Sequence, residues 1–109
     1  MPVVTVSVTA RASAGTLPIY VDLDITATDR DTGERVYSRS KTLVITDLTI
    51  PETYMDQFTG EPGRTYLIDA TATFRNDYGQ DIKTASKEVT IPIPGEPPKG
   101  EISLEVTVT

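Results

Sequence analysis

The chain has 109 residues and a net charge of −6, and it contains no cysteine and no histidine. Its length allows one domain with its own core, and the missing residue types exclude disulfides, thiolate chemistry and the commonest general base and metal ligand. The acidic balance argues against nucleic acid as a partner, because phosphate backbones are also negatively charged.

The chain shows neither a membrane span nor a signal peptide. No apolar run reaches the roughly 20 residues that a membrane helix needs. Residues 1–5 alternate from the start and lack the charged and apolar regions of a signal peptide. We therefore expect no membrane insertion, and either a native intracellular or virion protein or a domain of a longer exported protein.

The first part of the chain predicts strands, since apolar and polar residues alternate with the period of two that a sheet imposes. Residues 3–10 form a first strand and residues 19–28 a second one, with a loop rich in glycine and proline signals between them. The sequence Asp-Thr-Gly-Glu at residues 31–34 is typical of a tight turn. Residues 35–41 return as an edge strand, whose arginine and lysine side chains discourage pairing with other sheets.

The middle of the chain is less regular. Leu43, Val44 and Ile45 predict a short buried run, which ends at Pro51 because proline rarely continues a strand. Residues 52–58 fit either a short strand or a single helical turn.

Residues 62–91 carry the clearest pattern in the sequence. Residues 65–75 alternate strictly, which predicts a strand with one apolar face and one polar face. The turn at residues 76–79 closes a hairpin, and residues 82–91 return. The apolar face of the first strand consists of Tyr66, Ile68, Ala70, Ala72 and Phe74.

The C-terminal residues form a separate strand. Residues 95–100 are rich in proline and glycine, which indicates a semi-rigid linker after a sandwich domain of residues 1–94. Residues 101–109 alternate again, in a pattern similar to that of residues 3–10. We expect this strand to fold back onto its own domain; the alternatives are the first strand of a following repeat, or strand addition to another molecule.

Together these elements predict an all-β fold, a single antiparallel Ig-like β-sandwich of about seven or eight strands. The expected inner-face residues are Val4, Val6, Val8, Ile19, Val21, Leu23, Ile25, Val44, Tyr66, Ile68, Ala70, Ala72, Phe74, Val89 and Ile91.

The pattern Pro62-Gly63-x-x-Tyr66-x-Ile68-x-Ala70 resembles the E–F corner and F strand of fibronectin type III modules and related Ig-like domains of bacterial, archaeal or viral surface proteins. The resemblance implies a tyrosine corner, in which the Tyr66 hydroxyl bonds to the backbone upstream. The chain departs from those families in having no tryptophan, which they usually bury on an early strand. Polycystic-kidney-disease-type repeats and other bacterial surface repeats are alternatives.

Asp29 and Asp31 are the candidate metal ligands, because carboxylates at alternate positions can converge on calcium. They resemble part of an EF-hand loop but lack its third ligand position and its distal glutamate, so a polar turn is the simpler interpretation. We expect no resident cofactor, with calcium as the alternative. The triplet at residues 31–33 is also that of aspartic proteases, but its charged neighbours fit an exposed turn better.

Tyr20, Tyr37, Tyr54 and Tyr78 are candidates for a sugar-binding platform. Tyr20 is expected on the outside of its strand and Tyr78 at a turn tip, and nothing in the sequence places the four together.

No nucleophile, base and orienting group can be named together, so we expect no enzyme. The sequence favours a non-enzymatic structural or interaction module, a spacer or adhesive domain of a larger protein at the cell surface or outside the cell. Its partners would be proteins, reached through tandem domains or strand addition. The alternatives are a virion domain that decorates a capsid or tail, and a calcium- or carbohydrate-binding module.

Overall fold

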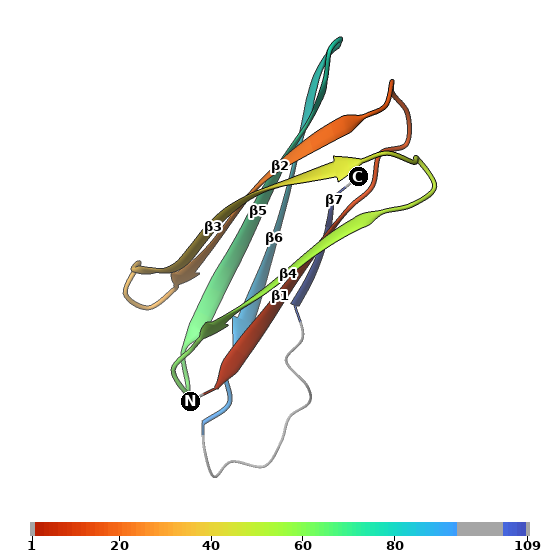
Figure 1. The fold of residues 1–109 in the computed structure, drawn as a ribbon. Coiled ribbons are helices and arrows are strands. Elements are labelled where there is room, and N and C mark those ends of the chain that lie inside the picture. Colours follow the sequence, from red (N-terminus) through yellow and green to blue (C-terminus); the bar gives the residue numbers. More distant parts are fainter. Residues whose placement is uncertain (1, 94–103, 109) are drawn as a thin grey trace.

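The computed structural model describes residues 2–93 and 104–108, and these form seven strands (Figure 1). The linker expected at residues 95–100 lies outside the described residues. In the part of the chain that is described, no helix has the length and apolar character needed to cross a membrane. The strands are β1 (Val3–Ala10), β2 (Ile19–Asp29), β3 (Arg35–Ile45), β4 (Glu52–Thr59), β5 (Thr65–Asn76), β6 (Gly79–Thr90) and β7 (Leu104–Val108).

The strands form a β-sandwich of two sheets, as expected. One sheet has the order β4-β1-β7 and the other has the order β3-β2-β5-β6. All pairs are antiparallel except β1 and β7, which run parallel with Val6 opposite Leu104. The segment 104–108 thus pairs with β1 of its own chain.

The core lies between the two sheets and follows the alternation of the sequence. Every inner-face residue expected from the sequence is buried, with the single exception of Val44. β5 shows the pattern most clearly, because every second residue from Tyr66 to Phe74 is buried and each residue between them, Leu67 included, is less buried. The core also contains buried residues outside the expected set: Ala10, Ala12, Ala27, Tyr37, Ile45, Phe58, Leu104 and Val106.

The expectation for Val44 is wrong. Its side chain is 40% exposed, because β3 continues through Ile45 and the apolar run alternates like the rest of the strand. Ile45 lies opposite buried Ile19, whereas Val44 lies opposite Tyr20 on the outer face. Three consecutive apolar residues do not define which face is buried, and the pairing with β2 decides it.

The pairing of strands also decides the structure of two further segments. Residues 52–58, which fit either a strand or a helical turn, belong to β4, an edge strand that pairs along its whole length with β1. The edge position expected for residues 35–41 is confirmed, since β3 pairs with β2 alone. Arg39 and Lys41 lie opposite the buried residues Ile25 and Leu23, so these cations are on the inward side of the edge strand.

A hydrogen-bonded cluster joins the edge strands β3 and β4 of the two sheets. The Asp56 carboxylate accepts hydrogen bonds from the Tyr37 hydroxyl at 2.8 Å and from the Arg39 Nε at 3.0 Å. These bonds, the Tyr37 bond first, lower the pKa of Asp56 to about 2. Burial, with the nearby carboxylate, raises the pKa of Tyr37 above its ordinary range. The side of the sandwich between β3 and β4 is therefore closed by polar contacts over the core.

Candidate functional site

The two ends of the sandwich hold most of the candidate residues predicted from the sequence. The Tyr66 end comprises the β2–β3 turn and the β4–β5 connection. The Tyr78 end comprises the β1–β2 loop and the tip of the β5–β6 hairpin, at the top of Figure 1.

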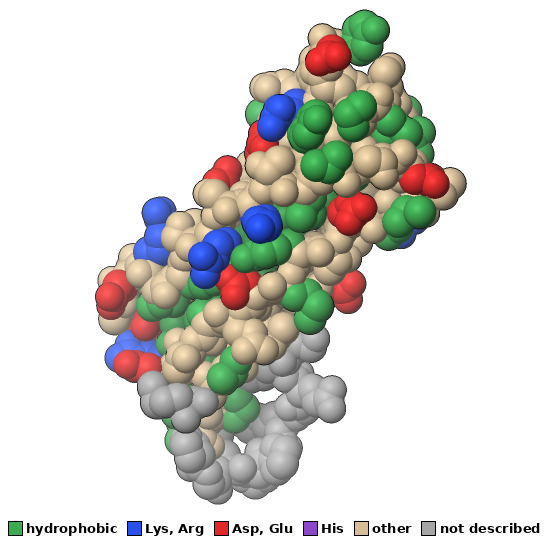
Figure 2. All heavy atoms as spheres, in the orientation of Figure 1, with side chains coloured by type: hydrophobic (Ala, Val, Ile, Leu, Met, Phe, Trp, Pro, Cys, Tyr) green, Lys and Arg blue, Asp and Glu red, His purple; other side chains and the backbone are tan. Residues whose placement is uncertain are grey.

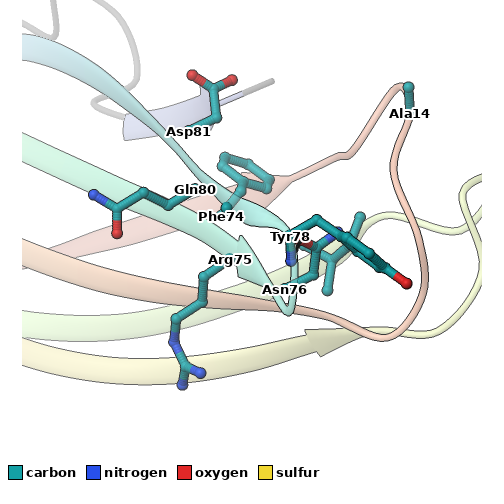
Figure 3. A pocket seen from close by; sticks show the side chains of 9 residues that line it. Ala14, Phe74, Arg75, Asn76, Tyr78, Gln80 and Asp81 are labelled. Atoms are coloured by element: carbon teal, nitrogen blue, oxygen red, sulfur yellow. Dashed lines mark hydrogen bonds between the residues drawn. The ribbon is translucent and has the colours of Figure 1, made fainter.

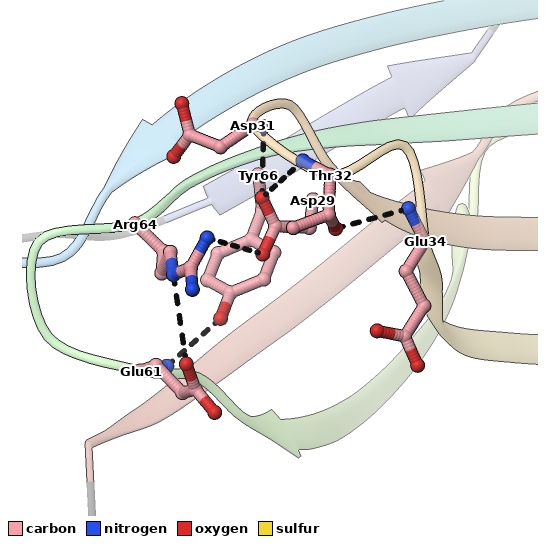
Figure 4. Close-up of polar contacts among 7 residues, drawn as sticks. All are labelled: Asp29, Asp31, Thr32, Glu34, Glu61, Arg64 and Tyr66. Carbon is pink, nitrogen blue, oxygen red and sulfur yellow. Dashed lines mark hydrogen bonds and ion pairs between the residues drawn. The ribbon is translucent and has the colours of Figure 1, made fainter.

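Asp29 organises the β2–β3 turn at the Tyr66 end (Figure 4). Its side chain is only 6% exposed, and its Oδ1 accepts hydrogen bonds from the backbone N–H groups of Asp31 at 2.8 Å and Thr32 at 3.3 Å. Gly33 supplies the positive φ of 74° that this turn requires. The Arg64 guanidinium lies 3.6 Å from the other carboxylate oxygen of Asp29. Both oxygens of this carboxylate are therefore engaged by the protein itself.

The structure does not bring Asp29 and Asp31 together as a pair of ligands. Figure 4 shows the Asp31 carboxylate directed away from that of Asp29, and Asp31 is exposed. Within residues 2–93 and 104–108, no three acidic side chains gather in a way that could hold a metal ion. Calcium binding stays a hypothesis, while Asp29 has a structural role in the turn.

Tyr66 fills the interior of the same end. Its ring is 2% exposed and packs edge-on against Phe58, with ring centroids 5.5 Å apart. Its hydroxyl accepts a hydrogen bond of 2.8 Å from the backbone N–H of Glu61, five residues upstream. Gly60 leaves room for this ring, because a Cβ there would overlap the side chain of Ile91 and lie 3.0 Å from the ring. The hydroxyl thus pins the β4–β5 connection to the core.

The Tyr78 end is built differently, around the tip of the β5–β6 hairpin. The Asn76 side chain accepts a hydrogen bond from the Tyr78 N–H at 2.9 Å and donates one to the Thr16 carbonyl at 3.1 Å. One side chain therefore shapes the tip and fastens it to the β1–β2 loop. The Tyr78 ring, by contrast, is 82% exposed.

Two shallow hollows flank the hairpin tip, and Tyr78 lines both of them. The first encloses about 210 Å³ between the tip and the β1–β2 loop. Among the side chains that line it, Phe74 and Asp81 lie on one face of the hairpin and Arg75 lies on the other (Figure 3). The second encloses about 190 Å³ and lies on the outer face. The second hollow is lined by Thr16, Leu17, Pro18, Tyr20, Arg75, Asn76, Asp77 and Tyr78.

Arg75 lies over the ring of Tyr20 in the second hollow. Its guanidinium carbon lies 4.9 Å from the centre of the Tyr20 ring, within range of a cation–π contact. Its Nε lies 2.7 Å from Asp22 Oδ2. Hydrogen bonds from Arg75 and then Thr42 lower the pKa of Asp22. The guanidinium is thereby fixed in position by contacts within the protein.

The tyrosines are less scattered than the sequence suggests. Tyr20 and Tyr78 meet at one hollow, and Tyr37 and Tyr54 both bond to Asp56. The four do not gather on one surface, but strand pairing sets Tyr20 opposite Arg75, next to the hairpin tip that carries Tyr78. The sequence predicts that Tyr20 faces outward on its strand and that Tyr78 lies at a turn. It does not predict that β2 pairs with β5, which is what brings the two together.

Some apolar side chains at this end are exposed. Leu17 lines the second hollow and Val44 lies opposite Tyr20, and both are exposed. Figure 2 shows hydrophobic side chains gathered at the upper end of the molecule. This end offers aromatic faces, amide and carboxylate groups and one fixed guanidinium. Such groups recognise a ligand by contact and hydrogen bonding.

Comparison of the chain with protein-family models, with curated proteins and with solved structures finds no match.

Proposed function

We propose that the chain is a non-enzymatic interaction module of the Ig-like or fibronectin type III-like kind, a spacer or adhesive domain of a larger protein at the cell surface. Its partners are proteins, bound at the Tyr78 end and through strand pairing. The observation that carries this proposal is the surface at the Tyr78 end, where the exposed side chains of Tyr20, Tyr78 and Leu17 lie beside the fixed Arg75.

The strand order supports the Ig-like kind. Ig domains place strands A, B and E in one sheet and C, F and G in the other, and variable domains add C′ to the second sheet. The order β7-β1-β4 corresponds to A-B-E, and the order β3-β2-β5-β6 corresponds to C′-C-F-G. This correspondence requires β7 to take the place of strand A, so that the usual first strand comes last in this chain. It departs from the Ig pattern in one respect, because β7 runs parallel to β1 whereas the sheets of Ig domains are antiparallel.

The position of Tyr66 agrees with the same correspondence. β5 takes the place of strand F, and Tyr66 lies at its start, directly after the β4–β5 connection. A tyrosine corner has a tyrosine near the start of strand F whose hydroxyl bonds to the backbone a few residues upstream. The hydrogen bond from the Glu61 N–H to the Tyr66 hydroxyl fits that description.

The correspondence also supports the choice of the Tyr78 end as the binding end. In variable domains the B–C and F–G loops form part of the antigen-binding surface. Here the β1–β2 loop and the tip of the β5–β6 hairpin take those positions, and they carry the two hollows. Tyrosine provides large contact area at a low cost in conformational entropy, which suits an adhesive surface.

The proposal is tested by panning a phage-displayed random peptide library on the folded chain. We expect enriched peptides that bind the native chain and lose binding to Tyr78→Ala. Met55→Ala is the matched control, because Met55 is also exposed and apolar but lies on β4, away from the hairpin tip.

Peptides that bind Tyr78→Ala as well as the native chain, or a library without enrichment, would contradict the proposal. The same variants on a glycan array separate the carbohydrate-binding alternative: glycan binding that depends on Tyr78, without peptide binding, would replace the adhesive function with sugar recognition.

A further inference from the structure

The edges of the two sheets are protected unequally. β3 carries Arg39 and Lys41 on its inward side, and β6 carries Lys83 and Lys87 opposite the core residues Ala72 and Ile68. Inward-pointing charges at a sheet edge disfavour the docking of another strand, because docking would bury them.

The remaining two edges belong to the sheet β4-β1-β7. β4 has Asp56 opposite core residue Val6, and that carboxylate is held by Tyr37. β7 differs: the two inward side chains that are described, Leu104 and Val106, are apolar and 3% exposed. Among the described strands, β7 is thus the edge on which no inward charge is seen.

β7 is also the strand least integrated into its sheet. It is a short edge strand that, among the described strands, is hydrogen-bonded to β1 alone, and that pair is parallel. Parallel pairs are slightly less stable per residue than antiparallel ones. Without β7, however, Val6 and Val8 of β1 would lose cover on one side, so this position beside β1 has to be filled.

We propose that the position beside β1 is a strand-acceptor site, and that a second copy of this chain fills it with its own segment Leu104–Val108. This inference deepens the strand-addition part of the proposed function. In the exchanged state, Leu104 and Val106 of one copy pack over Val6 and Val8 of the other, in the register that the single chain shows. The donor's own site is filled by a further copy or, in a closed dimer, by its partner.

The composition of the connection is compatible with exchange as well as with the closure within one chain that the structure shows. Thr90 and Leu104 are separated by residues 91–103, which include Pro92, Pro94, Pro97 and Pro98. In Figure 1, β6 ends and β7 begins at the same end of the sandwich, so closure requires the chain to reverse between them. Proline-rich segments are extended, semi-rigid spacers by composition, and such a spacer also suits a connection that runs from one molecule to another.

The contacts of β7 are the same in both states. The free energies therefore differ only by the cost of closing the connection in one chain and the cost of bringing two chains together. Exchange should accordingly increase with protein concentration, whereas the closed state should not.

Two full-length single-cysteine variants test the exchange. Ser7 and Glu105 are paired across β1 and β7, and the native chain has no cysteine that could interfere. Ser7→Cys and Glu105→Cys are mixed at high concentration, equilibrated and oxidised. We expect a disulfide-linked heterodimer in several-fold excess over that from a Thr84→Cys and Glu105→Cys mixture, because Thr84 lies on exposed β6 of the other sheet.

A further variant separates exchange from random collision. Glu105→Cys combined with Val106→Asp should abolish the excess, because the donated strand would bury a charge. Three results would overturn the inference: no excess over the Thr84→Cys control, an excess that survives Val106→Asp, or an excess that does not rise with concentration. If one of these results were found while peptides still bound at Tyr78, strand exchange would be rejected and the proposed adhesive function would be retained.

Discussion

Two tyrosines at opposite ends of one hairpin have opposite surroundings. Tyr66 opens β5 and is buried with its hydroxyl bonded to the Glu61 N–H, whereas Tyr78 lies just beyond the other end of β5 and is almost fully exposed. The residue type is the same, so the difference comes from position. A tyrosine whose side chain faces inward from a strand packs in the core, and a tyrosine at the tip of a turn is available to a ligand.

The polar groups at the two ends differ in the same way. At the Tyr66 end, Asp29 and Glu61 bond within the protein and hold the connections between strands. At the Tyr78 end, Asn76 fastens the hairpin tip to the neighbouring loop, and Arg75 is fixed beside an open hollow. We therefore expect substitutions at the Tyr66 end to change stability and those at the Tyr78 end to change binding.

Tyr66→Ala should produce the largest loss of stability. Removal of this buried ring leaves a cavity beside Phe58 and frees the Glu61 N–H, and an aromatic-to-alanine change in a core costs about 3–5 kcal/mol. Urea denaturation measures the free energy of unfolding. A loss below about 1 kcal/mol would show that the ring is not part of a packed core.

Asp29→Ala should have the next largest effect. The change leaves the N–H groups of Asp31 and Thr32 without their acceptor, at a cost of about 1–3 kcal/mol. Asp29→Asn is the matched control, because its amide oxygen keeps an acceptor while the contact with Arg64 loses its charge. An alanine variant as stable as the asparagine variant would contradict the role of Asp29 in the turn.

Acid should weaken the contact between the sheets without distinguishing the two ends. The pKa of Asp56 is about 2 rather than 3.8, so its ionised form stabilises the fold above pH 3.8, and this contribution disappears as the pH falls through about 2. Urea midpoints of the native chain and of Asp56→Asn should therefore differ at neutral pH and converge toward pH 2. A constant difference would show that the carboxylate charge has no part in this contact.

Tyr78→Ala should have the smallest effect on stability. The side chain is exposed and packs on little, so the change in unfolding free energy should stay within about 0.5 kcal/mol. Binding of selected peptides should fall in the same variant. A marked loss of stability instead would make Tyr78 a structural residue and remove it from the proposed surface.

Much of the fold was predictable, because alternation is a local property. The inward set of β5 and the turn at Asp31–Glu34 follow from neighbouring residues alone, and the structure confirms the face and the turn. Val44 shows the limit of such prediction. The register of β3 with β2 decides which face of the sheet Val44 lies on, and a run of three apolar residues does not encode that register. The parallel pairing of β7 likewise depends on an edge far away in the sequence.

The candidate site was predictable only in pieces. Tyr20 and Tyr78 were each expected at the surface, but their meeting depends on β2 pairing with β5. Asp29 was assigned as a candidate ligand, because a carboxylate in a turn looks the same in sequence whether it binds an ion or the backbone. Its burial and its two N–H donors distinguish these roles.

The contrast between the two tyrosines is tested most directly by removing only their hydroxyl groups. The free energy of unfolding is measured in urea for Tyr66→Phe and Tyr78→Phe under identical conditions. We predict a loss of about 1 kcal/mol or more for Tyr66→Phe, because the Glu61 N–H loses its acceptor, and no measurable loss for Tyr78→Phe. Equal stability of the two variants would contradict the account.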